Sequence, residues 1–583
     1  MRKFTADFET TTDENDCRVW AYAICEIGNT NNFIYGNNIE DFINWCANKR
    51  ENYLIYFHNL KFDGEFIFSY LLKNGYRCIK DKKEREDKTF TTLISDTGQF
   101  YSIEIYFNTK NSKHINKVTI YDSFKILKFS VDRIAKDFNL PISKLTLDYE
   151  KKREIGHELS QDEIDYIRND VEIMARALKI MFDEKLTKMT IGSDALANYK
   201  EINKNFNKYF PVLPYEIDKD IRRSYKGGFT YLNEIYKGKE TGAGLVLDVN
   251  SLYPSVLKNE KIPFGDPIYF DGKYENDTLY PLYVQTISCI FEIKENKIPT
   301  IQIKHNLSFL PNEYIKTSNG DIVTLTLTNI DLELFFKHYK VTDLTYHSGW
   351  KFKAINGLFS EYIDYWSNKK IQSKKEKNFA MYQISKLMLN SLYGKFGLNP
   401  NVRSKYPYLS ESGIIKYGMY QAEIRDSIYI PVATFVTSYA RLKTITTSQK
   451  IREYSLNRYG KDLYVYSDTD SIHCLITDDN ELKEYIEIDD YKLGAWKKES
   501  EFKKGKYLRQ KCYIEQGYDE KINVTIAGLP KNAGELVTFN NFDVGFTCDQ
   551  NLDYKHVAGG VILVNSEFSI KGEKKNDSKK YCN

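Results

Sequence analysis

The sequence predicts a protein of several domains that combine α/β and α+β architecture, and three observations support this. The chain has 583 residues, which is more than one hydrophobic core normally serves. Apolar and polar residues alternate over residues 4–8, which is the period of a strand, whereas residues 160–174 have the spacing of an amphipathic helix. No run of about 18 apolar residues is present that could span a bilayer.

Composition narrows the class of protein. Hydrophobic residues make up 42% and charged residues 28%, as in globular proteins. The 83 Lys and Arg nearly balance the 80 Asp and Glu, so the net charge of +3 neither requires nor excludes nucleic acid. The nine cysteines include no Cys-x-x-Cys pair, and Asp7 and Glu9 interrupt any apolar signal core. We therefore expect a cytoplasmic protein with reduced thiols, not secreted and without a membrane partner.

The first acidic pair lies on the predicted N-terminal strand. The period of two places Phe4, Ala6 and Phe8 on one face and Asp7 with Glu9 on the other. A half-exposed strand can show the same pattern by chance. The pair becomes a candidate site because two further acids, Asp63 and Asp170, are carried by later predicted elements.

Asp63 follows a predicted strand end at residues 54–57, and Asp170 lies on a predicted helix that opens with a capping box at Ser160. Tyr166 lies four residues before Asp170, on the same helix face. Asp7, Glu9, Asp63 and Asp170 can converge on two divalent ions, which would activate water for phosphodiester hydrolysis, with Tyr166 orienting that water.

Three more segments carry candidate chemistry after residue 220. Residues 222–229 combine cations with the pair Gly227-Gly228, which lets a backbone approach phosphate, although a simple turn has the same pattern. An apolar strand ends at Asp248, before Pro254. Asp468 and Asp470 lie at the predicted tip of a hairpin, where a polar turn is the alternative to a Mg²⁺ or Mn²⁺ site.

A fourth segment is a helix with one polar face. Lys386, Asn390 and Tyr393 are spaced i, i+4 and i+7, so a cation, an amide and a ring lie together. The cation can neutralise a triphosphate and the ring can pack on a base pair. An ordinary amphipathic helix remains the alternative for this segment alone.

The first three acidic elements resemble the three exonuclease motifs of family B DNA polymerases, in the same order. The resemblance implies an RNase H-like α/β domain with 3′-5′ exonuclease activity at the N-terminus. It also implies that the single-stranded 3′ end is held by one set of side chains: Asn59, Phe62, Ser123 and Phe124. Lys144 would assist the hydrolysis, in contact with the DNA.

The later segments resemble polymerase motifs A, B and C of the same family, and the extended strings at residues 17–22, 58–64 and 506–511 are similar to protein-primed phage enzymes of the phi29 type. This implies palm, fingers and thumb subdomains. Asp248 and Asp470 would hold two Mg²⁺ or Mn²⁺ ions, with Val249 beside them in the metal site and Asp468 supporting them. Two metals are expected in each active site.

The resemblance also implies substrate contacts. Tyr253 would stack under the nucleotide sugar and exclude a 2′-hydroxyl. The triphosphate would be bound by Lys386, Asn390, Tyr393 and Lys370, although a longer Lys-rich stretch at residues 368–379 leaves Lys370 open. The template strand would be contacted by Tyr225, Gly227 and Gly228, and the primer strand by Lys511 and Tyr513, in a basic run that could otherwise be a solvated face.

Protein-primed members carry two insertions, one that meets the priming protein and one that encircles DNA. The predicted domains are exonuclease (1–190), linker with the start of the palm (191–260), palm (261–302), first insertion (303–359), fingers (360–398), second insertion (399–431), palm (432–530), thumb (531–570) and a disordered tail (571–583).

Together these features predict a DNA-directed DNA polymerase that a phage expresses in the host cytoplasm. Its expected partners are template and primer DNA, dNTPs, a terminal protein primer and a single-stranded DNA-binding protein. We expect a monomer or a heterodimer with the terminal protein. A nuclease with a DNA-binding second half, an inactive replication scaffold and an RNA-templated polymerase are the alternatives.

Overall fold

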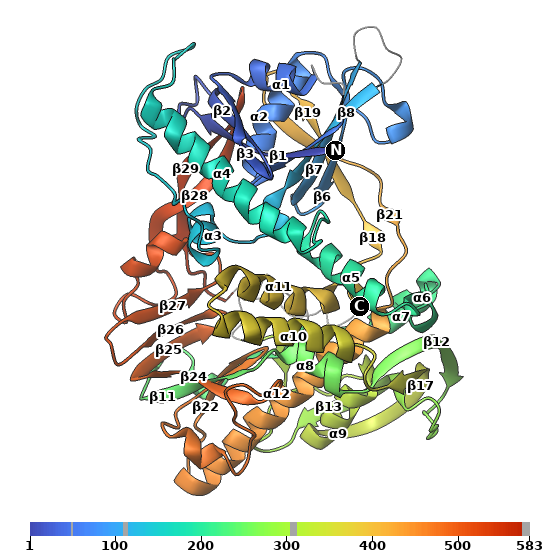
Figure 1. The fold of residues 1–583 in the computed structure, drawn as a ribbon. Helices are drawn as coiled ribbons and strands as arrows, with labels where there is room; N and C mark the ends of the chain where they lie inside the picture. The colour runs from blue at the N-terminus through green and yellow to red at the C-terminus, as the bar shows by residue number, and fades with distance from the viewer. Residues whose placement is uncertain (48–50, 109–114, 303–311, 574–583) are drawn as a thin grey trace.

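The computed structural model describes residues 1–47, 51–108, 115–302 and 312–573, and its N-terminal part is built on one large mixed sheet (Figure 1). The strands of that part have the order β3-β2-β1-β4-β8-β7-β6, and β1, β4 and β8 are mutually parallel. Their bounds are β1 Arg2–Thr10, β2 Val19–Glu26, β3 Asn29–Gly36, β4 Tyr53–Phe57, β6 Thr89–Ser95, β7 Phe100–Asn108 and β8 Ile115–Asp122.

Helices cover both faces of this sheet. Helices α1 (Ile39–Ala47) and α2 (Leu60–Lys73) pack on the face that carries Phe4 and Phe8. Helix α4 (Gln161–Asp183) packs on the opposite face, where the Thr5 hydroxyl donates a hydrogen bond to the Val171 carbonyl at 2.7 Å. The predicted capping box of α4 is present. The α/β prediction for this part is therefore confirmed.

The second half of the chain is centred on a five-stranded antiparallel sheet with the order β24-β11-β23-β22-β9. Its strands are β24 Trp496–Phe502, β11 Gly244–Val249, β23 Ser471–Cys474, β22 Tyr464–Asp468 and β9 Thr230–Leu232. Helices α8 (Leu252–Asn259) and α12 (Ile430–Tyr459) share the hydrophobic core of this sheet. Helices α10 (Ser360–Lys375) and α11 (Phe379–Phe396) lie side by side above it (Figure 1).

The segment predicted as a linker after residue 190 is a packed helix, α5 (Ile191–Ile202). Ile191, Ala195 and Tyr199 recur every four residues, and all three are buried. The Tyr199 ring stacks on Phe359 with centroids 4.5 Å apart. The exposed face of this helix is polar, which gave the stretch a linker-like composition. Its apolar face packs into the hydrophobic core.

The first predicted insertion belongs to a larger unit than expected. A four-stranded sheet has the order β12-β17-β13-β16, with helix α9 (Asn329–His338) packed on it. Its strands are β12 Ile262–Asp271, β17 Tyr339–Ile355, β13 Leu282–Ile293 and β16 Val323–Thr328. Two of them precede residue 303, so the sheet crosses the predicted boundary between palm and insertion. Residues 303–311 lie outside the described residues.

The second predicted insertion forms a hairpin, β19 (Ser404–Leu409) and β20 (Ile415–Met419), that joins another unit. Strand β19 pairs with β6 at Ser404 and Ser95, which extends the N-terminal sheet. A small ladder of β18 (Asn401–Val402) and β21 (Glu423–Ile424) forms the base of the hairpin.

The C-terminal unit also crosses a predicted boundary. Strands β25 (Lys504–Arg509), β26 (Cys512–Gln516) and β27 (Ile522–Ile526) form a sheet, and a long hairpin of β28 (Thr547–Val557) and β29 (Gly560–Ser569) follows. Leu508, Ile514, Phe542 and Ile570 share one hydrophobic core, so the predicted start of the thumb at residue 531 divides one folded unit.

Most of the predicted disordered tail, residues 574–583, lies outside the described residues. Within the described parts of the chain, no helix is long and apolar enough to cross a membrane.

Candidate active sites

The first acidic cluster forms where β1 meets α4. Alternation along β1 directs Asp7 and Glu9 to the side that α4 covers, and α4 contributes Asp170. One carboxylate oxygen of each of these three residues lies within 4.8 Å of the others. The structure therefore brings together three of the four predicted acids from segments 160 residues apart in the chain.

Asp63, at the start of α2, is the fourth acid, and its charge interacts with those of Asp7 and Glu9. Burial, followed by the charges of Asp7 and Glu9, raises the pKa of Asp63 well above its ordinary value. Burial and then Asp170 raise the pKa of Asp7 to about 7. Oδ1 of Asp63 and Oδ1 of Asp170 are buried without a hydrogen-bond partner. Four crowded carboxylates with unused oxygens are the donor set that divalent cations prefer, so these residues fit a metal site.

Lys144 and Tyr166, the two residues predicted to assist hydrolysis, lie beside the acids. The Lys144 ammonium lies 3.1 Å from Oδ2 of Asp170, and the Tyr166 hydroxyl shares a 2.5 Å hydrogen bond with the hydroxyl of Tyr149. Sequence reasoning missed Tyr149. It lies in the loop between α3 (Val131–Asp137) and α4, where neither helical nor strand periodicity marks a functional residue.

The four residues predicted to hold a single strand lie at the ends of β4 and β8. The Ser123 hydroxyl donates to the Phe57 carbonyl at 3.1 Å, and Phe124 is 37% exposed. Buried Asp122 accepts from the backbone N–H groups of both Asn59 and Phe124 at 3.0 Å. Asp122 therefore fixes the backbone at both ends of this surface. An Asp directly before a Ser is typical of an Asx-type turn, so the sequence pattern could have indicated this role of Asp122. Phe62 lies on the first turn of α2, one residue before Asp63.

The second acidic pair is formed by neighbouring strands of the five-stranded sheet. Asp248 on β11 pairs with Ser471 on β23, and the Val249 N–H donates to the Asp470 carbonyl at 2.8 Å. The predicted hairpin with Asp468 and Asp470 near its tip is confirmed. Burial, with the charge of Asp470, raises the pKa of Asp248 to about 6. The two carboxylates thus share one partly desolvated site that can hold divalent ions.

Asp468 differs from this pair in its partners. It accepts from the Thr230 hydroxyl at 3.1 Å and pairs with the Lys511 ammonium at 2.7 Å. Lys511 has a positive φ of 53°, and its N–H donates to the Tyr466 hydroxyl. Tyr513 stacks on Tyr507, with centroids 5.3 Å apart, beneath the same hairpin. Both predicted primer contacts therefore lie next to the acidic tip.

Three lysines from different elements lie close to the acidic pair. The Lys497 ammonium is 3.4 Å from Oδ2 of Asp248, and Lys370 on α10 donates to the Ser251 hydroxyl at 3.3 Å. Burial, then the charges of Lys386 and Lys497, lower the pKa of Lys370. Repulsion among these cations would be relieved by a bound polyphosphate. The structure thus places Lys370 beside Lys386, and it adds Lys497, which sequence reasoning had placed in a basic run for the primer.

Two predicted nucleotide-binding rings meet above the same site. Tyr253 on α8 and Tyr393 on α11 have centroids 4.1 Å apart. Lys386 and Asn390 lie on exposed positions of the same helix as Tyr393. Helix α11 therefore contacts α8, the helix that follows the strand carrying Asp248.

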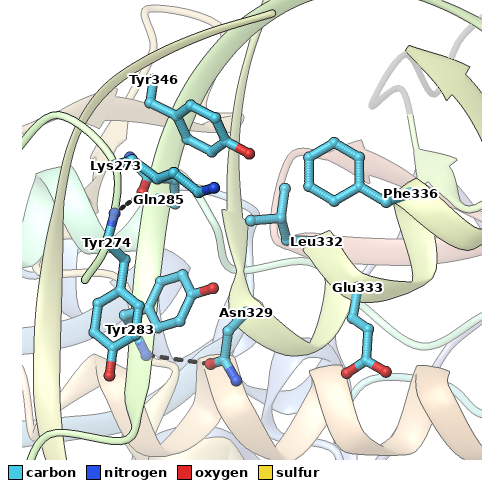
Figure 2. Close-up of a pocket in the computed structure, with 9 residues that line it drawn as sticks. All are labelled: Lys273, Tyr274, Tyr283, Gln285, Asn329, Leu332, Glu333, Phe336 and Tyr346. Carbon is cyan, nitrogen blue, oxygen red and sulfur yellow. Dashed lines mark hydrogen bonds between the residues drawn. The ribbon is translucent and has the colours of Figure 1, made fainter. Parts of the chain in front are cut away.

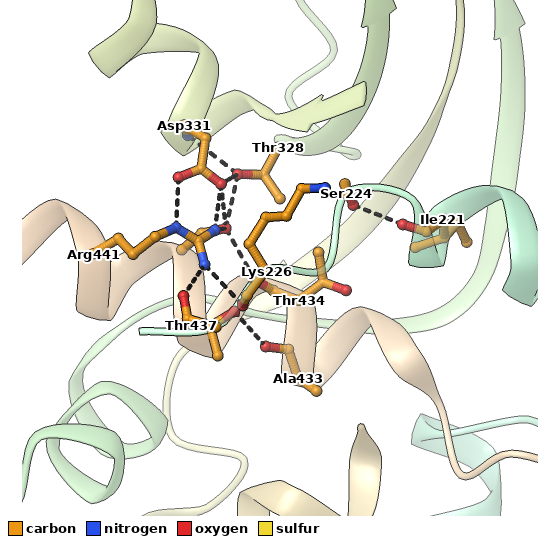
Figure 3. A network of polar contacts seen from close by, with 11 residues as sticks. Ile221, Ser224, Lys226, Thr328, Asp331, Ala433, Thr434, Thr437 and Arg441 are labelled. Carbon is orange, nitrogen blue, oxygen red and sulfur yellow. Dashed lines mark hydrogen bonds and ion pairs between the residues drawn. The ribbon is translucent and has the colours of Figure 1, made fainter. Parts of the chain in front are cut away.

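The loop with the glycine pair packs on the acidic hairpin. A Cβ atom on Gly228 would come within 2.5 Å of the Thr469 hydroxyl, so only glycine allows this approach. Buried Arg441 on α12 donates to the carbonyls of Lys226 and Gly227, at 2.9 and 2.8 Å (Figure 3).

The same guanidinium binds Asp331 of α9 through two hydrogen bonds, of 3.1 and 2.6 Å. Sequence reasoning missed Arg441, because its partners are backbone carbonyls and an acid more than 100 residues away.

One cavity lies apart from both acidic sites. It has a volume of about 410 Å³ and lies between α9 and the strands β13 and β17 (Figure 2). The Tyr274 and Tyr283 rings stack at 3.8 Å on one side, and Leu332 and Phe336 of α9 line another. No predicted site residue lines this cavity.

Comparison with known proteins agrees with this geometry. A family model described as "DNA polymerase type B, organellar and viral" matches residues 46–157 and 146–487. The chain is 46% identical to the DNA polymerase of Bacillus phage B103, over 98% of this chain and 100% of that protein. It is 43% identical to the DNA polymerase of Bacillus phage phi29, over 98% and 99% of the two chains.

Solved structures of the phi29 enzyme are similar over the same length. The complex with primer-template DNA and incoming nucleotides has a TM-score of 0.90 and 43% identity, covering 98% of this chain and 100% of that one. The complex with single-stranded DNA has a TM-score of 0.88 and 42% identity, with the same coverage. The chain belongs to the organellar and viral type B DNA polymerases and is a DNA-directed DNA polymerase.

Proposed function

We propose that this polymerase begins synthesis on a hydroxyl of a terminal protein, continues with strand displacement, and removes mispaired 3′ ends in a separate exonuclease site. The observation that carries the two-site proposal is the presence of two groups of acids on different sheets, one at Asp7, Glu9 and Asp170 and one at Asp248 and Asp470. The similarity to phi29 structures with primer-template DNA and with single-stranded DNA supports the same assignment.

For nucleotide addition, the oxygen of the primer hydroxyl forms a bond to the α-phosphorus of a dNTP. The bond to the bridging oxygen breaks, pyrophosphate leaves with the electron pair, and the hydroxyl proton is lost to solvent. Lys370, Lys386 and Lys497 offset the triphosphate charge. Asp248 and Asp470, beside the Val249 backbone, are the residues that would hold two Mg²⁺ or Mn²⁺ ions. Such ions, when bound, polarise the phosphate and stabilise the leaving oxygen.

We assign the substrate contacts to residues around the same site. The Tyr253 and Tyr393 rings form an apolar wall on which the incoming sugar and base can pack. Lys511 and Tyr513 are placed for the primer strand, and the Tyr225–Gly228 loop for the template.

For proofreading, water attacks the last phosphodiester and the departing 3′-oxygen takes up a proton. Tyr166, supported by Tyr149, is placed to orient that water, and Lys144 offsets charge beside Asp170. Asp7, Glu9, Asp63 and Asp170 would hold the divalent ions. Asn59, Phe62, Ser123 and Phe124 form the surface on which we place the frayed 3′ end.

Priming by a terminal protein is tested by its covalent product. The full chain is incubated with its candidate terminal protein, primed DNA, Mg²⁺ and one labelled dNTP, and the products are separated under denaturing conditions. We expect label to migrate with the terminal protein and to resist heat and detergent. Label only on added DNA primers would overturn protein priming while leaving the polymerase assignment intact.

A further inference from the structure

The five-stranded sheet and the sheet that contains β25, β26 and β27 lie next to each other (Figure 1) and meet through four side-chain rings. Each sheet contributes one cross-strand pair, Tyr466 with His473 on β22 and β23, and Tyr507 with Tyr513 on β25 and β26. The centroids of any two of these rings are between 5.0 and 6.0 Å apart. Cross-strand ring pairs stabilise the strands that carry them, so this ring cluster joins the two sheets.

One buried carboxylate lies beside the ring cluster and contacts both sheets. Glu515 follows Tyr513 by two residues on β26, so the two side chains lie on the same face. Its Oε1 accepts from the Tyr507 hydroxyl at 2.5 Å and lies 2.6 Å from Nδ1 of His473, which donates to it when the ring proton is on Nδ1. Glu515 is 5% exposed and His473 is 2% exposed. A buried acceptor shared by donors on two sheets therefore links β23 to β26.

The ring cluster also holds the turn between β25 and β26 that carries Lys511. The Tyr466 hydroxyl accepts from the Lys511 N–H at 2.9 Å, and the Lys511 carbonyl accepts from the Ala527 N–H at 2.8 Å. These two bonds hold Lys511 in a left-handed conformation with a φ of 53°. Tyr466 lies two residues before Asp468 on β22, so one side chain of the cluster connects the Lys511 turn to the strand of the acidic tip.

We propose that Glu515 and His473 are positioning residues for nucleotide addition, because their buried contact sets the place of Lys511 relative to the acidic hairpin. Glu515 bonds to one residue of each ring pair, and the hydroxyl of Tyr466 anchors Lys511. Loss of the contact lets the two sheets shift, and a primer bound by Lys511 and Tyr513 then presents its 3′-hydroxyl out of line. Since a misplacement of about 1 Å can slow a reaction about a hundredfold, a small shift is enough. The inference rests on the proposed contact of Lys511 and Tyr513 with the primer.

The incoming nucleotide is assigned to other elements. Tyr253 and Tyr393 lie on α8 and α11, and Lys370 lies on α10, whereas the ring cluster lies on β22, β23, β25 and β26. A defect in positioning should therefore lower the maximal rate constant of addition without changing the dNTP concentration that gives half of it. A general loss of stability should instead lower the amplitude of a single turnover and leave its rate constant unchanged.

The first experiment removes the acceptor at residue 515 in the full chain. Glu515→Leu loses both hydrogen bonds, whereas Glu515→Gln keeps a carbonyl oxygen for the Tyr507 hydroxyl and for His473. With enzyme in excess over primer-template DNA and with Mg²⁺, the rate constant of one addition is measured over a range of dNTP concentrations. We expect Glu515→Leu to lower the maximal rate constant about tenfold with half-saturation changed less than about twofold, and Glu515→Gln to lower it less than about threefold. An unchanged rate constant in Glu515→Leu would overturn the proposal.

A matched pair of buried histidines separates positioning from stability. His473→Phe keeps a ring in the cluster and loses the donor to Glu515, while the Tyr507 bond remains, so it is the second variant if Glu515→Leu does not fold. His338 on α9 is 4% exposed, and its Nδ1 lies 2.7 Å from the Ile298 carbonyl. We expect His473→Phe and His338→Phe both to lower the Tm, and only His473→Phe to lower the rate constant, by about tenfold. Equal rate constants in the two histidine variants would count against positioning and overturn the proposal.

The decisive arm is a cycle with Lys511→Met, which removes the ammonium and keeps the length of the side chain. Lys511→Met alone should lower the rate constant about tenfold. If Glu515 acts through Lys511, adding Glu515→Leu should slow the Lys511→Met enzyme less than about twofold further, whereas independent effects would multiply to about a hundredfold. A hundredfold loss would overturn the assignment of Glu515.

The two possible failures are distinguishable. A normal rate constant in Lys511→Met would refute the proposed primer contact, and the inference that rests on it. A slow Lys511→Met enzyme together with a normal Glu515→Leu enzyme would leave the primer contact intact and refute only the positioning role.

Discussion

Replacement of Arg441 by Met tests whether one buried guanidinium holds the template loop. Met is similar in length, but it removes two hydrogen bonds to Asp331 and two to the carbonyls of Lys226 and Gly227. Breaking a buried ion pair by removing one partner costs ~3–5 kcal/mol. Asp331 retains hydrogen bonds from the Thr328 and Ser438 hydroxyls, so we expect the lower end of that range.

The functional consequence follows from the two carbonyls. Without Arg441 the loop that ends at Gly228 loses its anchor to α12, although its contact with Thr469 remains. Since we propose that this loop contacts the template, we expect the Kd for primer-template DNA to rise about tenfold, equivalent to ~1.4 kcal/mol. Hydrolysis of single-stranded DNA should be unchanged, because the acids that we propose for the exonuclease site lie on another sheet.

The assay is a double-mutant cycle with Asp331→Asn. Thermal unfolding and DNA binding are measured for both single variants and for the double variant. Because Arg441→Met leaves an unpaired buried acid, removing that acid should restore part of the stability, and the two losses should be non-additive by at least ~1 kcal/mol. Additive losses, or unchanged DNA binding in Arg441→Met, would refute the reasoning.

Three further predictions concern the two acidic sites and one buried acid. Asp470→Asn should abolish nucleotide addition and spare 3′ hydrolysis, while Asp7→Asn should do the reverse. Both activities are measured on a labelled primer, with and without dNTPs. Parallel loss of the two activities in either variant would contradict separate sites. Tyr149→Phe should slow hydrolysis about tenfold, on the order of 1.4 kcal/mol, without slowing addition, because it removes the hydroxyl bonded to Tyr166. Asp194 is 2% exposed, and burial raises its pKa to about 7. Between about pH 4 and about pH 7 the folded state therefore keeps a proton that the unfolded chain releases. The free energy of unfolding consequently falls as the pH rises through this range. Asp194→Asn should therefore raise the Tm at about pH 8, by the equivalent of ~2–4 kcal/mol, and leave it unchanged at about pH 4; an equal shift at both pH values would contradict this origin.

The acidic residues were predictable because local rules decide their placement. Alternation along β1 directs Asp7 and Glu9 to one face, and a two-residue turn places Asp470 next to the strand that carries Asp248. These periodicities depend only on neighbours in the sequence.

The cations around these acids could not be predicted in the same way. Lys497 approaches Asp248 because β24 pairs with β11, and Lys370 approaches Ser251 because α10 packs over α8. Long flexible side chains carry no periodic signal of their tertiary partner. The basic run therefore indicated attraction to phosphate without showing which lysine faces the acidic pair.

Packed units extend across the predicted domain boundaries for a related reason. Pairing of β19 with β6 uses backbone hydrogen bonds, which leave little trace in side-chain patterns. The thumb core joins Leu508 to Ile570 across a change in local composition, so a boundary drawn on composition falls inside it. Packing between distant segments decided both boundaries.

Electrostatics explains how one chain keeps its two acidic sites distinct. In the polymerase site, Asp248 pairs with Lys497 and Asp468 with Lys511, so part of the repulsion is offset without metal. Among the described residues, the four acids that we propose for the exonuclease site form an ion pair only through Lys144. We therefore expect bound divalent ions to relieve more repulsion among Asp7, Glu9, Asp63 and Asp170, where one lysine pairs with the acids, than at Asp248 and Asp468, each of which has its own lysine. The two sites should consequently respond differently to removal of divalent ions, with a larger loss of local order around α4 than around the β22–β23 hairpin.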